Sequence, residues 1–272
     1  MIDPARQPLH WPPGSVRLRI AYVADAPADR RVVAELPSPL NRRAIALPDG
    51  AGTTAELELL SIPTPEIEDP ELIERVREWT AAGMPTVQMM TFQGAQLFWG
   101  EGRAAVMAAP HRLAALEAVV VELAYYEAEL VGVERAVAGF WPELEADGGP
   151  AFEMDERAHR HRARLARRFR ELLGVRARLT RIIPFVHTPH VYPPTLASQV
   201  SERLRERTRM RHRAEVLQDQ LEVFERIYDA CGARAGEFTA NRKNHLLEMV
   251  IIVLLAAQTL LVLFEILTRA RT

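Results

Sequence analysis

The stretch TVQMMTFQGAQLFWG, residues 86–100, indicates the fold class, because it holds two β-prone runs on either side of a turn-forming Gln93-Gly94. The runs 86–92 and 95–99 have the length and composition of strands. Similar runs lie upstream at 16–24, 42–47 and 55–62. Asp69-Pro70-Glu71 predicts a helix among these strands, because aspartate is a good N-cap and proline suits the first helical position. Residues 1–109 are therefore expected to form a small α+β head domain.

From Pro110 onward the apolar residues take up helical spacing. We predict a stalk domain at 110–241 made of long antiparallel helices, at about 110–140, 153–183 and 196–231. The breaks are expected at Ala136 to Pro150 and at the prolines 184, 189, 193 and 194. The third helix carries a coiled-coil-like seam of alternating four-three spacing, formed by Leu217, Leu221, Phe224, Tyr228 and Cys231.

The run LLEMVIIVLLAAQTLLVLFEIL, residues 246–267, predicts one C-terminal transmembrane helix at 246–268. At about 1.5 Å per residue the run reaches about 33 Å, which is enough to span a bilayer. No signal peptide pattern precedes it, so the expected topology is a tail anchor with the bulk of the chain cytoplasmic. Gln258 and Thr259 fall near the middle, where side-chain hydrogen bonds between copies would favour a homo-oligomer. The competing interpretation is a buried helix in a soluble oligomer.

The net charge of −2 hides an uneven distribution. Residues 1–150 carry 22 acidic and 12 basic side chains, whereas residues 151–245 carry 12 acidic and 20 basic ones. The arginines of the second part predict contact with anionic lipid, RNA or the ribosome. Alternatively they form a solvated face that answers the acidic head or a partner copy. No aromatic RNA-binding motif accompanies them, and DNA is not an expected partner. The candidate contact residues are Arg160, Arg164, Arg167, Arg168, Arg205 and Arg209.

Residues with catalytic chemistry are sparse. The single cysteine, Cys231, excludes an intrachain disulfide and a four-cysteine zinc site. His187 and His190 flank Thr188-Pro189, with no carboxylate nearby at ligand spacing. The chain lacks the Gly-x-Ser-x-Gly, phosphate-loop and His-Glu-x-x-His motifs. We therefore predict no catalytic, cofactor-binding or metal-binding residue.

Three stretches together resemble the Required for Meiotic Nuclear Division family. They are Gly94–Gly100 (GAQLFWG), Arg213–Leu217 (RAEVL) and Leu247–Ile252 (LEMVII), in the order and spacing of that family. The chain departs from the family pattern at Gln218-Asp219-Gln220 and at Gln258, and residues 1–93 show no match. The resemblance implies an oligomeric, membrane-anchored protein without known catalytic residues. The family's mitochondrial members support translation by tethering ribosomes to the inner membrane.

These observations together predict a tail-anchored, non-enzymatic, oligomeric scaffold that tethers a ribosome, RNA or a protein partner to a membrane. The first alternative is a subunit of a magnesium-transporter-type channel, although the Gly-Met-Asn motif and second span of such channels do not occur in the sequence. The second alternative is an enzyme with its site in the N-terminal domain.

Overall fold

The computed structural model describes residues 11–48, 54–64, 69–81, 87–152, 156–187 and 195–269. Within the helices, side chains are described outside 148–152, 156–162, 231–243 and 261–269. In chain order the elements are β1 Val16–Val23, β2 Val32–Glu35, β3 Arg43–Leu47, β4 Leu57–Pro63, α1 Pro70–Ala81, β5 Gln88–Phe92, β6 Ala95–Gly100, β7 Arg103–Ala108, α2 Pro110–Phe152, α3 Glu156–His187, α4 Leu196–Arg207 and α5 Met210–Arg269. The α+β class is confirmed.

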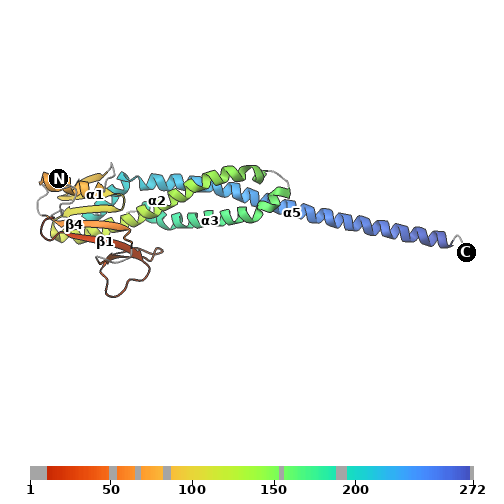
Figure 1. Ribbon diagram of the computed structural model, residues 1–272, viewed down its shortest axis with the longest axis horizontal. Helices are drawn as coiled ribbons and strands as arrows, with labels where there is room; N and C mark the ends of the chain where they lie inside the picture. The colour runs from red at the N-terminus through yellow and green to blue at the C-terminus, as the bar shows by residue number, and fades with distance from the viewer. Residues whose placement is uncertain are drawn as a thin grey trace, which may run out of the picture. The chain divides into compact units, whose positions relative to one another are not determined.

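The chain divides into two compact units that share the long helices (Figure 1). Unit 1 comprises Met1–Arg135 and Ala177–Gln218, and unit 2 comprises Ala136–Arg176 and Asp219–Thr272. The first part of α2 therefore belongs with the sheet rather than with a separate stalk that starts at residue 110. The reason is packing, because this part of α2 buries Leu116, Val120 and Leu123 in unit 1.

Among the described residues of unit 1, the strands form one seven-stranded sheet in the order β2-β3-β1-β4-β7-β6-β5. The β4–β7 pair is parallel and the other neighbours are antiparallel. Strand β4 lies at the centre, and its residues Leu59, Leu60, Ser61 and Ile62 are all buried. Alternating residues of a strand face opposite sides of a sheet, so both faces are covered.

The two faces are covered by different helices. Leu60 and Ile62 face helix α1 and join a cluster with its Val76 and Trp79. Ser61 faces the other way, and its hydroxyl donates a hydrogen bond of 2.6 Å to Glu117 of α2. Asp69 caps α1 as predicted, since its Oδ1 accepts hydrogen bonds from the next two free backbone N–H groups.

Gly100 offers a direct test of this packing, because it ends β6 against the last turn of α1. A Cβ atom at Gly100 would lie 2.7 Å from the backbone oxygen of Thr80. We expect Gly100→Ala to lower the free energy of unfolding by about 1–3 kcal/mol, since backbone must move to admit the methyl group. A urea titration followed by circular dichroism measures the loss.

The matched control for this change is Gly139→Ala. Gly139 lies inside α2, and a Cβ atom there would meet nothing within 4 Å. Alanine is the better helix former by about 1 kcal/mol, so the control should raise stability. Equal effects of the two substitutions would contradict the packing described for Gly100.

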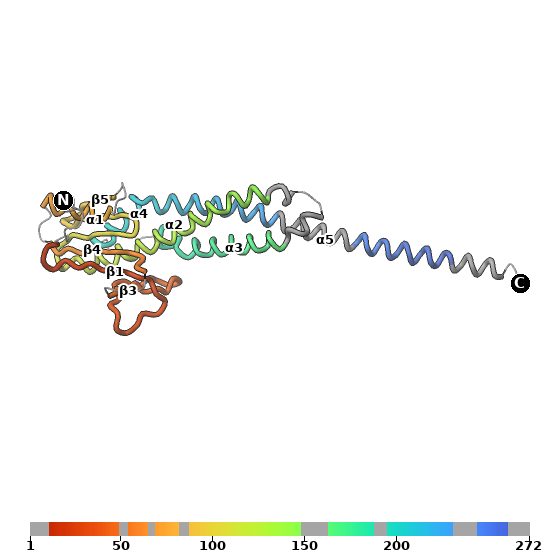
Figure 2. The backbone as a smooth tube through the Cα atoms, in the orientation of Figure 1, coloured from red at the N-terminus to blue at the C-terminus, as the bar shows by residue number. Residues whose placement is uncertain are grey.

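In unit 2, helices α2, α3 and α5 lie side by side along their described parts (Figure 2). The predicted seam of α5 is buried at Leu217, Leu221, Phe224 and Tyr228, while Cys231 lies outside the described side chains. Phe224 packs edge-on against Phe140 and Trp141 of α2, with ring centroids 5.9 and 4.8 Å apart.

Two of the predicted helices end later in the chain than the sequence predicts. Helix α2 continues through Ala136 and Gly139 to Phe152, where burial of Phe140 stabilises the helix. Helix α3 continues through Pro184 to His187, because Phe185 is buried and its ring stacks on Tyr126 at 5.6 Å. In this last turn, the burial of Phe185 outweighs the free-energy cost of placing proline inside a helix.

The predicted third helix is two helices in the structure. Helix α4 ends at Arg207, where the Thr208 hydroxyl donates to the carbonyl of Leu204 at 2.9 Å. Arg209 then takes a positive φ of 53°, a left-handed conformation typical of helix C-termini. Neither glycine nor proline marks this break, so the sequence pattern missed it.

Helix α5 contains the run that the sequence predicts to be transmembrane. The side chains of this run are described from Leu246 to Leu260, and all of them are exposed. Among the parts of the chain that the structure describes, no helix is long and apolar enough to cross a membrane. The predicted transmembrane helix is therefore not supported by the described residues.

Candidate functional site

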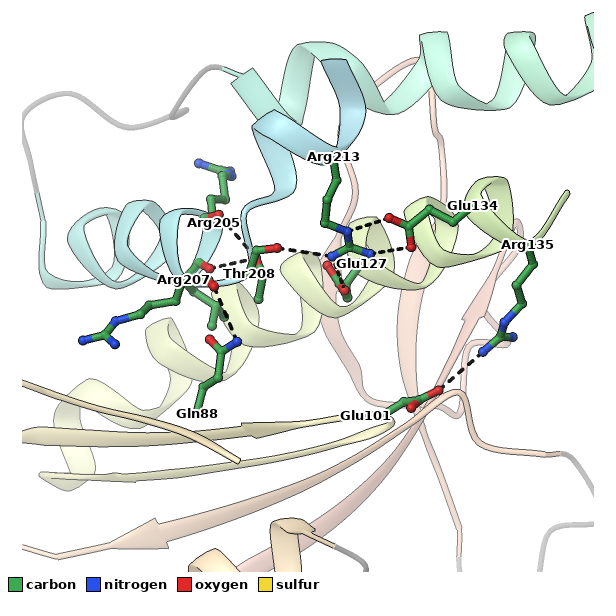
Figure 3. Close-up of polar contacts among 10 residues, drawn as sticks. Gln88, Glu101, Glu127, Glu134, Arg135, Arg205, Arg207, Thr208 and Arg213 are labelled. Carbon is green, nitrogen blue, oxygen red and sulfur yellow. Dashed lines mark hydrogen bonds and ion pairs between the residues drawn. The ribbon is translucent and has the colours of Figure 1, made fainter. Parts of the chain in front are cut away.

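A cavity of about 650 Å³ with both charged and apolar side chains in its walls lies in unit 1 beside the start of α5 (Figure 3). Strand residues Gln88 and Trp99 line one side of it, and Glu127 of α2 lines another. The turn between α4 and α5 contributes Arg207 and Arg209. Three parts of the chain that are distant in sequence, the β5–β6 hairpin, α2 and the α4–α5 turn, thus surround one space.

Arg213 is the central cation of this cavity, and its guanidinium donates to acceptors on three residues. Its Nη1 donates to Glu127 at 2.6 Å, while Nε and Nη2 donate to the two carboxylate oxygens of Glu134 at 2.7 and 2.8 Å. Nη1 also donates to the Thr208 carbonyl at 3.3 Å. The bidentate pair with Glu134 fixes the plane of the guanidinium, which is the strongest geometry for such a pair.

The local structure explains why these groups meet. Glu127 and Glu134 lie seven residues apart in α2, so they share one helix face. Helix α5 begins directly after Arg209, the residue with a left-handed backbone conformation, and Arg213 lies in its first turn. The turn at Thr208 and Arg209 therefore aims Arg213 at the α2 face.

Burial perturbs the protonation of this cluster. Desolvation raises the pKa of Glu127, although the hydrogen bond from Arg213 opposes the shift. The hydrogen bond to Glu134 raises the pKa of Arg213, and its contact with Glu127 adds to this effect. Arg213 is thus a permanent cation, whereas Glu127 can hold a proton at a higher pH than an exposed glutamate can.

Two acceptor atoms in the cavity wall are buried without a hydrogen-bond partner. They are Oε2 of Glu127 and Oε1 of Gln88. The Gln88 amide nitrogen does have a contact, a long one of 3.5 Å to the Arg207 carbonyl. The cavity therefore has a surplus of acceptors toward Gln88 and Glu127 and a surplus of positive charge toward Arg207 and Arg209. This arrangement suits binding of a polar molecule that carries both a donor and an acid group.

One further ion pair lies at the rim of the cavity. Arg135 forms an ion pair of 3.4 Å with Glu101 at its rim. Across the described parts of the chain, no group of three or more His, Cys, Asp or Glu side chains could hold a metal ion. Of the two loop histidines, His187 lies in the last turn of α3, and His190 lies outside the described residues.

The predicted contact residues of the second arginine run have different surroundings. Arg205 is only 8% exposed, and desolvation lowers the pKa of its guanidinium beside Glu122 and Tyr126. Arg209 is exposed at the cavity rim. Contact with lipid or RNA stays a prediction, and the placement of Arg209 suits it better than that of Arg205.

The first arginine run binds within the chain instead. Arg164 donates to Oδ1 of Asp147 at 2.8 Å, and Arg168 pairs with Oδ2 of the same carboxylate. The Asp147 side chain is 2% exposed, so it is a buried anion held by two cations. Arg167 is 67% exposed, and Arg160 lies outside the described side chains. Among the described arginines of this run, Arg167 is therefore the predicted lipid or RNA contact that is most exposed to solvent.

The predicted pair for helix association lies on α5, and both residues are exposed. The Thr259 hydroxyl donates to the Leu255 carbonyl of its own helix at 2.7 Å. Its donor is thus already used within the chain. Association of copies through Gln258 stays a prediction.

The sequence patterns did not single out Glu127, Glu134 or Asp147. The one available signal was the heptad spacing of Glu127 and Glu134, which is common on solvated helix faces. Comparison with known proteins adds no further assignment, because no family profile, curated protein or solved structure matches this chain.

Proposed function

We propose that the protein is a non-enzymatic tethering protein, held at a membrane by the apolar segment that begins at Leu246. The carrying observation is the exposure of that segment. Its large apolar side chains between Leu246 and Leu260 are 47–67% exposed. Contiguous apolar surface of this kind marks a site of contact with another protein or with lipid.

The distribution of these side chains favours lipid as the occupant. Residues Met249 to Leu255 are consecutive and all apolar, so successive side chains point about 100° apart and cover the whole circumference of α5. A second helix would cover only one stripe of such a surface. Acyl chains surround a helix on every side.

Charge supports the same proposal. Glu248 lies near the start of the segment and pairs with His245 at 3.1 Å. From Met249 to Phe264 the sequence has no ionisable residue. Sixteen such residues in a row would be unusual on a helix face that water surrounds, whereas a bilayer excludes charge from its centre.

The experiment introduces one charge into the segment of the full-length chain. Arginine at the centre of a membrane helix costs about 2.5–3.5 kcal/mol on the insertion scale. Leu254→Arg should therefore move most of the protein from the carbonate-washed membrane fraction to the soluble fraction. Quantitative immunoblotting of both fractions measures the change.

Val223→Arg is the matched control, because it adds the same charge to the same helix outside the segment. Val223 is 46% exposed, so arginine fits there without burying charge. The control should stay with the membrane like the unaltered chain. Soluble full-length protein without any substitution would overturn the proposal, and a defined oligomer in that fraction would make a second copy the occupant instead.

A further inference from the structure

Strand β5 forms one edge of the sheet, because it pairs with β6 only. The hairpin turn that joins the two strands is residues 93–94, both with positive φ. In a two-residue hairpin the flanking pair, here Phe92 and Ala95, exchanges both backbone hydrogen bonds, and the pattern alternates along the strand from there. Met89 and Thr91 therefore turn their N–H and C=O groups away from β6, toward the open edge.

This edge is free to accept another strand. Across the described residues, no hydrogen bond occupies the outward backbone groups of Met89 and Thr91, and both side chains are exposed. Edge strands are normally shortened, bulged or charged, which prevents pairing with other chains. The opposite edge strand, β2, has four residues and a shift in its register. Strand β5, with the sequence QMMTF, has a regular register and neither a charged residue nor proline.

A second cavity in unit 1, of about 380 Å³, lies along this edge strand, where Met89–Phe92 line it. Its other walls show which face of the sheet it occupies. Met90 shares a row of the sheet with Leu97 and Val106, which also line the cavity. That row continues to Ser61, whose hydroxyl bonds to α2. The cavity therefore lies on the α2 face, beside the open edge.

Helix α4 makes this place cationic. Val200, Arg203 and Arg207 line the cavity and share one face of α4, because they are three and four residues apart. Both arginines are exposed, and none of the described wall residues is acidic. Arg203 pairs with Glu206 at 3.0 Å, but that pair is exposed on both sides and therefore weak. A carboxylate that enters here would meet two guanidinium groups.

We propose that β5 binds an extended acidic segment of a partner protein, which adds to the sheet as an eighth strand. Main-chain hydrogen bonds to Met89 and Thr91 provide affinity, and alternate side chains of the segment provide specificity. Neighbouring strands lie about 4.8 Å apart, so the added side chains on the α2 face come next to Met90 and the cavity. At about 30 Å³ per water-sized group, the cavity holds roughly a dozen non-hydrogen atoms, enough for one or two side chains.

Charge favours a different protein over a second copy of this chain as the occupant. A copy that paired through its own β5 would bring the sequence QMMTF, which has no acidic residue. It would also bring its own cavity arginines to a site that already has two, and like charges oppose association. The proposal concerns the sheet, so it does not depend on how α5 is held.

The test titrates the full-length protein in mild detergent with the peptide acetyl-SVTETVS-amide and follows binding by isothermal titration calorimetry. In an extended peptide of this sequence, the valines and the glutamate share one side and the threonines the other. We expect one peptide bound per chain. The same peptide with glutamine in place of glutamate should bind at least tenfold more weakly, because the charge-assisted bonds to Arg203 and Arg207 are lost.

Two N-methylated forms of the acidic peptide test the backbone pairing. One form carries the methyl groups on the two threonine nitrogens, and the other carries them on the two valine nitrogens. Only every second residue of an added strand turns its N–H toward the neighbouring strand. One form should therefore lose at least tenfold in affinity, whereas the other should bind like the unmethylated peptide. Equal binding of the two forms would contradict strand addition.

Thr91→Pro removes an outward N–H from β5 itself. This N–H makes no bond to β6, and proline is tolerated at such positions of edge strands, so the denaturation midpoint should stay the same. Binding of the acidic peptide should fall at least tenfold. The matched control is Thr91→Val, which keeps the N–H and should leave binding unchanged.

Arginine variants test the charge. Arg203→Ala with Arg207→Ala should abolish the preference for glutamate over glutamine in the peptide. Arg211→Ala removes an exposed arginine that does not line the cavity, and it should keep the preference. Absence of peptide binding would overturn the proposal. So would a dimer of the unaltered chain that Thr91→Pro dissociates, because a second copy would then occupy the edge.

Discussion

Replacing Asp147 with asparagine is expected to lower the free energy of unfolding by about 3–5 kcal/mol, the range for breaking a buried ion pair by removing one partner. The carboxylate is 2% exposed and binds both Arg164 and Arg168. Asparagine keeps the shape of the side chain but leaves two cations facing a neutral amide. Arg168 is 17% exposed, so water cannot replace the lost partner fully.

The loss should be local to unit 2. The Tyr228 hydroxyl also donates a hydrogen bond to Asp147, at 3.4 Å. Burial is the main cause that raises the pKa of this phenol, and the negative charge of Asp147 raises it further. Faster hydrogen–deuterium exchange is therefore expected in α2, α3 and α5 near Asp147. Denaturant titration measures the free energy of unfolding, and hydrogen–deuterium exchange shows which helices are destabilised.

Glu145→Gln is the matched control for this prediction. Glu145 lies two residues away on the same helix and is exposed, so its loss should change stability by no more than about 0.5 kcal/mol. A loss below about 1 kcal/mol for Asp147→Asn would mean that the buried ion cluster contributes little to the fold.

Replacing Arg213 with methionine is expected to cost about 3 kcal/mol, the lower end of the range for a broken buried pair. The side chains of Arg213 and Glu127 are 24% and 22% exposed, so water screens part of the loss. Without Arg213, Glu127 and Glu134 would face each other as two anions on one helix face. Thermal or denaturant unfolding of the full-length chain measures the effect.

The size of this loss should depend on pH. Burial raises the folded-state pKa of Glu127 above its unfolded value, and Arg213 limits that rise. A raised carboxyl pKa means that the folded chain holds more protons across the window between the two values. The stability from this group therefore falls as pH rises through the window. Removing Arg213 widens the window, so the loss should be larger at about pH 8 than at about pH 5.

Two further variants isolate the cause. Arg211→Met removes an exposed arginine that pairs with Glu215, and it should cost no more than about 1 kcal/mol. Adding Glu127→Gln to Arg213→Met should restore part of the stability and remove most of the pH dependence. A loss that does not vary with pH, and that Glu127→Gln does not relieve, would show that packing rather than charge explains it.

Local chemistry allowed much of the fold to be predicted. The strand runs near β1, β3, β4, β5 and β6 and the Asp69 cap of α1 follow from composition and capping. Strand β7, with the sequence RAAVMA, has a single β-branched residue, Val106, and three alanines, so its composition does not mark it as a strand. It forms a strand because β4 and β6 pair with it on both sides. Its place in the sheet is a long-range property that no short window contains.

The candidate site could not be predicted for a related reason. An arginine-rich helix looks the same in sequence whether its charges meet water, lipid or buried carboxylates. Arg164 and Arg168 bind Asp147, and Arg213 binds Glu127 and Glu134, each across a long sequence separation. Which carboxylate an arginine meets depends on how its helix packs.

The sequence by itself determined the α+β class, the buried seam of α5 and the apolar run from Leu246, because these follow from side-chain periodicity and composition within one segment. Only the tertiary structure decided where helices end, which charges are buried and where the two cavities lie. Those features come from contacts between segments far apart in the chain. Their energies, from packing and desolvation, exceed the local preferences that a sequence pattern records.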